Sequence, residues 1–446
     1  MLVRFRNRVT MALVWVVLIA LVRTTVADKP AQGSFKLKQE VARLIGELNS
    51  ASRKQRVQAG KSLFEFGPKI LPLLPAPELL RTPSVRETVR QLRIRLERKK
   101  AQQSIGASTV QLVGKHSVAH MLNHIQEQTK NDLDLQLLPA EFLSQQQSVQ
   151  YEGVDFWKAV DQLCQQTNLT FRIPADASHL QFFKPTLPAK KKEQAVAYSR
   201  AFRVSVLEGQ SRKLFGNAQQ RKVRFRLGIT SEPRLRPLFL QYAAKNIQVQ
   251  TADGQYLKPF EPAAQYELPM GEGGRHVEIQ ADFLTDVDTE LTKIDLQGKF
   301  VMQTAAGVEE ISFTNLPQAT GVARRKGGVT VKLRKVQFKL VEAKIYQAEI
   351  QASVSYDSGG PAFESHRTWI FHNQAFLLAK DGKRIPMAGG FETTLQADGA
   401  ISVKYQFNRL AENPSTYRFV YLAPTLIINV PINFKLTGIP ISKVVD

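Results

Sequence analysis

The chain has almost no cysteine. Cys164 is the only one in 446 residues, so no disulfide can form within the chain and stability must come from packed cores. A content of 43% hydrophobic and 22% charged residues is ordinary for globular protein. Because a single hydrophobic core stops growing at roughly 250–300 residues, the length predicts about two to four domains.

The common catalytic motifs are also missing. The sequence contains no G-x-S-x-G, no H-E-x-x-H and no G-x-x-x-x-G-K pattern. Paired carboxylates can still meet when a chain folds, so this absence favours a non-catalytic protein and leaves an enzyme open. A polymer-binding hydrolase or carbohydrate-active protein is therefore the main alternative to a binding protein.

Long apolar runs are scarce, and the clearest lies at the N-terminus. Arg4, Arg6 and Arg8 precede an apolar run over residues 9–22, and small residues follow up to Ala27. Because the run is shorter than the roughly 20 apolar residues of a membrane span, residues 1–27 are predicted to be a cleaved signal peptide. The sequence thus predicts an exported protein that is periplasmic, envelope-bound or secreted. Arg23 leaves an uncleaved membrane anchor as the alternative; otherwise membrane contact is peripheral.

Acidic residues are in deficit. The chain has 61 Lys and Arg against 39 Asp and Glu, a net charge of +22, and loss of residues 1–27 removes four arginines and no acid, which leaves +18. Such a surface attracts anionic neighbours. Together with export, this favours envelope proteins or anionic cell-surface polymers as partners and argues against nucleic acid.

Helical spacing dominates residues 34–102. A second helix is predicted to begin near Ser52, and Ser84 with Glu87 forms a capping box before a third. The apolar residues at helical spacing are Leu37, Val41, Leu44, Ile45, Leu48, Val57, Leu63, Phe64, Val85, Val89, Leu92 and Leu96. The run "LIGELNSASRKQRVQAGKSLFEFGPKILPLLPAPELLRTPSVRETVRQLRIRLE" resembles one to two HEAT-type repeats. This resemblance implies that the segment packs on another domain or forms a docking surface.

Residues 105–185 repeat one pattern twice. The copies are "TVQLVGKHSVAHMLNHIQEQTKNDLDLQL" and "SVQYEGVDFWKAVDQLCQQTNLTFRI", each an extended run, an amphipathic helix and a second extended run. The predicted buried stripes are Val118, Met121, Leu122 and Ile125 in the first helix, and Phe156, Val160, Leu163 and Cys164 in the second, with Trp157 at its margin. The doubled βαβ pattern resembles the secretin/TonB short N-terminal (STN) domain, an α+β interaction module. This implies edge strands to which a partner strand can add.

From about residue 195 the hydrophobic period changes to two, and Asp253-Gly254 and Asp381-Gly382 mark hairpin turns. These signals predict tandem antiparallel β-sandwiches over residues 195–320 and 321–441. The complete prediction is a multi-domain α+β chain: a helical repeat segment, a small βαβ-βαβ module and two β-sandwiches. Its preferred function is that of an exported, non-catalytic scaffold or adaptor that binds envelope proteins or anionic polymers.

Three of the seven histidines recur at i, i+4 and i+8. Projected on a helix, His116, His120 and His124 share a face with Glu127, opposite the apolar stripe. Histidines one helical turn apart can bind Zn²⁺ together. A pH-responsive surface and a plain solvated face are the alternatives. The sequence therefore predicts no resident cofactor, with zinc at this stripe as a metal-handling alternative.

A second set of candidate ligands is acidic. Asp286, Asp288 and Glu290 alternate in "DFLTDVDTELTKID", which would place them on one face of a strand. Carboxylate oxygens are ligands for Ca²⁺, but the segment lacks the glycine and terminal glutamate of an EF-hand loop. An exposed polar strand face is the simpler interpretation, and calcium remains an alternative.

Overall fold

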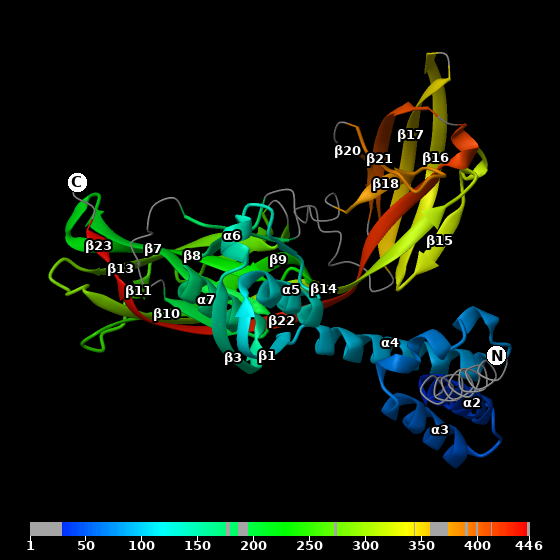
Figure 1. Ribbon diagram of the computed structural model, residues 1–446, viewed down its shortest axis with the longest axis horizontal. Helices are drawn as coiled ribbons and strands as arrows, with labels where there is room; N and C mark the ends of the chain where they lie inside the picture. The colour runs from blue at the N-terminus through cyan, green and yellow to red at the C-terminus, as the bar shows by residue number, and fades with distance from the viewer. Residues whose placement is uncertain are drawn as a thin grey trace, which may run out of the picture. The chain divides into compact units, whose positions relative to one another are not determined.

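The computed structural model describes residues 29–174, 179–185, 195–271, 274–342, 344–356, 373–388, 391–397, 400–411 and 413–443. The predicted signal peptide, residues 1–27, lies outside these ranges. The chain is a mixed α/β protein in which strands predominate, and it divides into two compact units, residues 1–100 and 101–446 (Figure 1). Among the described residues, no helix has the length and apolar character needed to cross a membrane.

The first unit is helical. It contains α2 (Lys29–Glu47), α3 (Arg53–Glu65), the 3-10 segments η1 (Pro68–Leu73) and η2 (Pro77–Leu79), and most of α4 (Pro83–Ser104). Helix α3 begins directly after Ser52, as predicted, and the Ser52 hydroxyl caps it by accepting a hydrogen bond from the Gln55 N–H at 3.5 Å. The predicted cap at Ser84 is wrong. Proline is favoured at the first helical position, so α4 begins at Pro83 and Ser84 lies inside its first turn.

One hydrophobic core holds the first unit together. Its buried residues are Val41, Leu44, Leu48, Ala59, Leu63, Ile70, Leu74, Val85, Val89, Leu92 and Leu96. Most of the predicted stripe is therefore buried. Val57 differs, because its side chain is 61% exposed and Ala59 takes the buried position in α3.

The second unit begins with the doubled strand–helix–strand arrangement that the sequence predicts. Its elements are β1 (Thr109–Ser117), α5 (Val118–Thr129), β2 (Leu133–Asp134), α6 (Ala140–Leu143), β3 (Gln146–Asp155), α7 (Phe156–Thr167), β4 (Thr170–Arg172) and β5 (Leu180–Phe183). We call these elements the βαβ module. Strands β1 and β3 form an antiparallel pair, while β5 pairs parallel with β2 and antiparallel with β4. Both long helices end at a left-handed residue, Lys130 and Asn168, which stops the helix.

The predicted stripes form the core of the βαβ module. Val118, Met121, Leu122 and Ile125 are fully buried, and so are Phe156, Val160 and Leu163. The expected marginal position of Trp157 is wrong. Its side chain is 1% exposed and its Nε1–H donates to the Ala201 carbonyl at 3.3 Å. Trp157 is therefore central to the packing of the module against the β-rich region.

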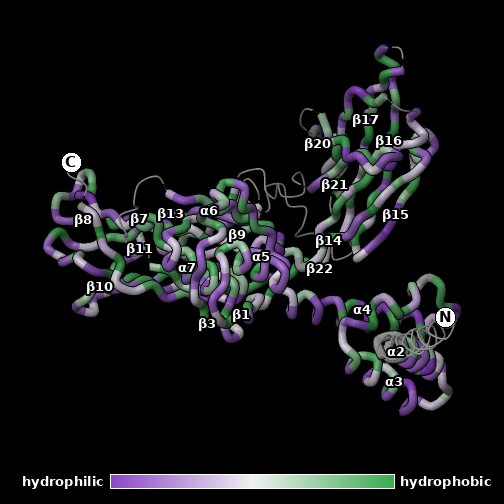
Figure 2. Tube along the Cα trace, in the orientation of Figure 1, coloured by the Kyte–Doolittle hydropathy of each residue, from purple (hydrophilic) through white to green (hydrophobic). Residues whose placement is uncertain are grey.

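Strands make up most of the rest of the described chain. They are β6 (Val196–Ser199), β7 (Phe202–Leu214), β8 (Asn217–Ser231), β9 (Arg236–Ala243), β10 (Ile247–Thr251), β11 (Lys258–Pro259), β12 (Gln265–Pro269), β13 (His276–Asp286), β14 (Lys293–Phe313), β15 (Ala323–Lys326), β16 (Val329–Glu342), β17 (Ile345–Tyr356), β18 (Ala375–Leu378), β19 (Arg384–Pro386), β20 (Phe391–Ala397), β21 (Ala400–Leu410), β22 (Arg418–Pro440) and β23 (Ser442–Lys443). They pair antiparallel except for β23, which lies parallel to β7. The helical segments among the strands in the described ranges are the short 3-10 turns η3 (Ala244–Asn246), η5 (Leu316–Gln318) and η8 (Pro414–Thr416). Apolar and polar residues alternate along the strands (Figure 2), and β13 shows this alternation in its burial.

These strands form three sheets that build two cores. A seven-stranded sheet, β12-β9-β14-β22-β18-β19 with β10 on β14, is common to both cores and is called the shared sheet. The first cover sheet, β11-β13-β8-β7-β23 with β6, packs on one part of it, and Phe225, Leu240 and Ile432 meet in that core. The second cover sheet, β15-β16-β17-β21-β20, encloses another core that contains Ile350, Phe313 and Phe419.

The two sandwiches are consequently interleaved along the chain rather than tandem. The expected division near Thr320-Gly321 separates β14 from β22, yet these strands pair from Lys293–Pro440 to Phe313–Phe419. In Figure 1 the red β22 passes from the second cover sheet's core to the first. The physical reason is that Val430, Ile432 and Leu436 fill the first core, which residues 195–320 alone would leave open.

Interleaving predicts how the chain tolerates deletion. Replacing residues 307–425 with a short Asn-Gly linker should preserve the first core, because Gly307 and Thr425 are paired neighbours on β14 and β22. A fragment ending at residue 320 should not fold, because it lacks β22. Circular dichroism and cooperative thermal unfolding would test both, and a stably folded 195–320 fragment would contradict this topology.

Candidate functional site

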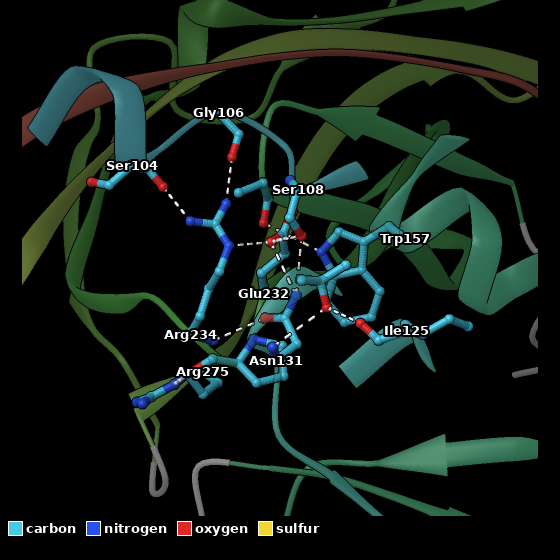
Figure 3. A network of polar contacts seen from close by, with 12 residues as sticks. Ser104, Gly106, Ser108, Ile125, Asn131, Trp157, Glu232, Arg234 and Arg275 are labelled. Atoms are coloured by element: carbon cyan, nitrogen blue, oxygen red, sulfur yellow. Dashed lines mark hydrogen bonds and ion pairs between the residues drawn. The ribbon is translucent and has the colours of Figure 1, made fainter. Parts of the chain in front are cut away.

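A buried carboxylate joins the βαβ module to the first cover sheet. The Glu232 side chain has no exposed surface. Its Oε1 accepts from the Ser108 N–H at 2.9 Å, and its Oε2 accepts from Ser108 Oγ at 2.6 Å, Asn131 Nδ2 at 3.2 Å and Arg234 Nε at 2.6 Å (Figure 3). A charge removed from water is tolerated only when partners compensate it. Here the backbone and side chain of Ser108, Asn131 and the Arg234 cation compensate the carboxylate.

Arg234 extends the same network. Its guanidinium also donates to the carbonyls of Ser104 and Gly106, and its backbone N–H donates to Asn131 Oδ1 at 3.0 Å. The network therefore ties together the end of α4, the residues before β1 and the residue that follows α5 (Figure 3). Because its donors and acceptors are already used, we interpret it as a joint that positions the module rather than a ligand site.

Helix α7 is fixed to the β-rich region by a second set of contacts. The Trp157 Nε1–H donates a hydrogen bond to the Ala201 carbonyl. Asp161 Oδ2 accepts hydrogen bonds from Arg203 Nε at 2.8 Å and from Tyr198 Oη at 2.6 Å. Cys164 packs against the module core, and burial raises the pKa of its thiol, so it behaves as a small hydrophobic residue as predicted. One side of α7 is thus committed to internal packing.

The outer edge of β3 has no partner strand in the described part of the chain. Strand β3 pairs only with β1, in a register that sets Val113 opposite Gln150 and Lys115 opposite Ser148. Every second residue of an antiparallel pair turns its N–H and C=O away from its neighbour. The hydrogen bond from Val118 N–H to the Gln145 carbonyl fixes which residues these are. Ser148, Gln150 and Glu152 therefore present their backbone groups outward.

A groove follows this edge. It is lined by β3 from Ser148 to Tyr151 and by three glutamines of α7: Gln162, Gln165 and Gln166. Tyr151 points inward, where its hydroxyl donates to the Ala159 carbonyl at 3.2 Å, whereas Gln150 is exposed. The groove thus combines outward backbone donors and acceptors with neutral polar side chains, which is what an added extended strand requires.

The corresponding edge of β1 is partly capped by side chains. Gln128 Oε1 accepts from the Gln111 N–H at 2.8 Å, and Gln128 Nε2 donates to the Gln111 carbonyl at 3.1 Å, so one amide takes the place of a neighbouring strand. His124 Nε2 lies 3.2 Å from the same carbonyl, and His116 Nε2 lies 3.1 Å from the Val113 carbonyl. Covering an edge in this way protects it from unwanted pairing. Among the described residues, the module therefore has one edge capped by side chains at Gln111 and Val113, and one edge, that of β3, without such caps.

The predicted histidine stripe is only partly helical. Ser117 caps α5 by accepting from the His120 N–H at 3.2 Å, so the helix begins at Val118 and His116 belongs to β1. The rings nevertheless stack: the centroids of His116 and His120 are 4.9 Å apart, and those of His120 and His124 are 5.7 Å apart. Nitrogen lone pairs lie in the ring planes, so stacked rings do not aim them at one point. Glu127 is exposed on α5, and no group of three or more metal-binding side chains occurs among the described residues.

The predicted acidic face of a strand does not form. Asp286 is the last residue of β13, and Asp288 and Glu290 lie in the turn that follows. The turn begins where the Thr289 N–H donates to the Asp286 carbonyl at 3.2 Å. The strand therefore ends at Asp286, and the three carboxylates do not share one strand face.

Sequence reasoning anticipated open edge strands but did not distinguish the two edges. The residues that it missed are Gln111 and Gln128 on the capped edge, and Gln150 and Gln162 beside the open one. The available signal was the abundance of glutamine in both copies of the repeated pattern. A glutamine pair between positions 111 and 128 depends on the fold and not on a local motif.

No family model and no curated protein sequence matches this chain. Among solved structures, "pT26-6p" is similar over 56% of this chain at 7% sequence identity, with a TM-score of 0.13. The match spans 66% of that chain, slightly less than two thirds of its length. A likeness at this level carries no argument about fold or function.

The joint at Glu232 predicts that removing the buried Arg234 cation lowers the free energy of unfolding more than removing a part-exposed arginine does. Arg234→Ala should lower the free energy of unfolding of the second unit by about 3–5 kcal/mol, because it leaves a buried carboxylate without its cation. Urea unfolding followed by tryptophan fluorescence would measure the change, since Trp157 lies in the same interface. Arg226→Ala is the control: that arginine forms part-exposed pairs with Glu208 and Glu278 and should cost much less. Equal losses would contradict the role of the joint.

The stacking of the three histidine rings predicts that this surface does not bind Zn²⁺. Isothermal titration of Zn²⁺ into the protein should give no heat above that of the buffer, because His116, His120 and His124 would have to break their stack to converge on an ion. A binding heat that disappears in His120→Ala would contradict this and restore the zinc interpretation.

Proposed function

We propose that this protein is an exported, non-catalytic scaffold of the cell envelope that binds a partner by adding an extended strand to β3. The observation that carries the proposal is the difference between the two edges of the module. Gln128 caps the β1 edge at Gln111, while Ser148, Gln150 and Glu152 leave β3 open beside a polar groove. A fold that protects one edge and not the other has a specific reason to keep the second accessible.

The joint at Glu232 supports the same function. Binding by strand addition gains affinity when the receiving edge is already rigid, because less conformational entropy is lost. Contacts of Trp157 and Asp161 hold one side of α7, and the glutamines on the same helix line the groove. The receiving edge is therefore supported by the larger β-rich region.

We further propose the finer domain identities. The helical segment of residues 34–102 is a HEAT-like docking element, and residues 105–185 form an STN-like interaction module. The fused β-sandwiches provide the body on which that module sits. Export by residues 1–27 would place these elements where envelope proteins and anionic polymers are the available partners.

The test uses two opposed prolines. Gln150 and Val113 face each other across the β1–β3 pair, and each turns its N–H outward, so proline at either position spares the bonds between the strands. The protein and the variants Gln150→Pro and Val113→Pro would be crosslinked to partners in intact envelope, and the complexes washed at low and high salt. We expect a partner that survives high salt and is lost only with Gln150→Pro.

Two other outcomes would reject the proposal. If all partners are lost as salt rises, the basic charge alone binds them, because salt screens exposed charges beyond about 8–10 Å. If Gln150→Pro and Val113→Pro retain the partner equally, its binding surface lies elsewhere. Thermal unfolding of both variants would establish that each is folded.

A further inference from the structure

A pocket opens where two sheet edges come together in the first sandwich. Strand β11 is the edge of the first cover sheet and β12 is the edge of the shared sheet. Residues 260–264 cross from one edge to the other, held by hydrogen bonds from the Phe260 N–H to the Asp282 carbonyl and from the Ala244 N–H to the Ala264 carbonyl, both at 2.9 Å. The crossing leaves a hollow of about 140 Å³ beside it.

Aromatic rings form the apolar part of this pocket. Tyr242 and Tyr266 are stacked with centroids 4.8 Å apart, and Tyr242 is held edge-on against Phe300 at 5.5 Å. Phe260 and Tyr266 remain 40% and 37% exposed. Burial raises the pKa of the Tyr242 phenol, so that hydroxyl stays protonated. The pocket therefore offers partly exposed aromatic surface on Phe260 and Tyr266.

Charged groups also line this pocket. Lys222 Nζ lies 2.6 Å from Asp282 Oδ2 and 4.4 Å from the centre of the Phe260 ring. Arg224 makes a bidentate pair with the same carboxylate, at 2.7 and 2.9 Å. Burial acts to raise the pKa of Asp282, but hydrogen bonds from Arg224 and Lys222 outweigh it and lower that pKa. Both cations and the carboxylate are thus charged and fixed in place.

A second, smaller cleft adjoins the pocket and shares Lys222 with it. Its walls are Gln210, Arg212, Lys222 and Arg224. Arg212 stands opposite Lys222 on neighbouring strands, and its side chain is exposed. Three cations meet here with Asp282 as the one carboxylate that pairs with any of them among the described residues. The cleft therefore has excess positive charge next to an aromatic surface.

We propose that the pocket and cleft together bind one anionic sugar unit of a polysaccharide, with its ring against Phe260 and Tyr266 and its carboxylate against Arg212 and Lys222. The aromatic faces suit the C–H surface of a pyranose. The polar groups around them, which include Asp282, Glu261 and Gln280, suit its hydroxyls. Glu261 and Gln280 are exposed beside the rings, where they can exchange hydrogen bonds with sugar hydroxyls that a planar aromatic acid lacks.

This site lies on other strands than the open β3 edge and does not depend on it. It gives the protein a second way to bind, in which charge and ring stacking act together. The sugar site predicts that both the charge and the ring of the ligand matter, so that an anionic saccharide binds better than a neutral saccharide and better than an anion without a sugar ring. Basic charge alone would not make the second distinction.

The experiment is isothermal titration of the full chain with trigalacturonate, with maltotriose and inorganic phosphate as separate probes. We expect saturable binding of trigalacturonate at one site, and no binding of the other two. Phe260→Ala should weaken binding at least about tenfold, and Phe260→Tyr should restore it. Arg212→Gln should weaken it several-fold, whereas its neighbour Lys213→Gln, outside the cleft, should leave the affinity unchanged.

Several results would overturn the proposal. Maltotriose binding as tightly as trigalacturonate would remove the role of the cations, and phosphate binding alone would remove the role of the sugar. Equal losses in Arg212→Gln and Lys213→Gln would reduce the effect to unspecific attraction by a basic surface. If the protein does not bind trigalacturonate, the proposed sugar site is rejected. Thermal unfolding would confirm that each variant is folded.

Discussion

The arrangement of the second unit depends on one buried carboxylate. Glu232 brings together Ser108 at the entry to β1, Asn131 at the end of α5 and Arg234 on the β-rich region. Because none of its charge reaches solvent, each partner must stay in place to compensate it. The βαβ module is consequently a fixed part of the second unit, and the open edge of β3 is presented on a rigid body. Affinity gained by strand addition requires that rigidity.

A second constraint is the pairing of β14 with β22. These two long strands pass through both cores, so the first sandwich cannot be completed by a contiguous stretch of chain. The second is built almost entirely from residues 305–423, which lie in sequence between the first sandwich's portions of these two strands. The shared sheet also leaves its edge strand β12 beside the edge strand β11 of the first cover sheet. The aromatic pocket lies at that meeting of edges, where side chains such as Tyr266 cannot be covered by a further strand. The topology thus accounts for both the cooperative cores and the exposed aromatic surface.

Local chemistry was readable from the sequence, and distant pairing was not. The stripes Val118–Ile125 and Phe156–Leu163, the cap at Ser52 and the turn at Asp253-Gly254 depend on neighbours a few residues apart. The Glu232–Ser108 hydrogen bond spans 124 residues, and the β14–β22 ladder joins segments more than a hundred residues apart. A local hydrophobic period therefore predicts neither the hydrogen bond nor the strand pairing. His116 shows the intermediate case: its helical spacing was real, but the cap at Ser117 placed it in a strand.

The basic charge of the chain does not act as one uniform field. Three arginines pair with acidic side chains of the same chain: Arg203 with Asp161, Arg224 with Asp282 and Arg234 with Glu232. These carboxylates neutralise most of the charge of these three arginines. The groove along β3 is lined instead by neutral glutamines. Attraction by unpaired surface cations falls as salt rises, whereas backbone hydrogen bonds to β3 do not depend on it. Under the proposed function, such a protein would be drawn to an anionic envelope by its charge and would still select its partner by a contact that charge does not control.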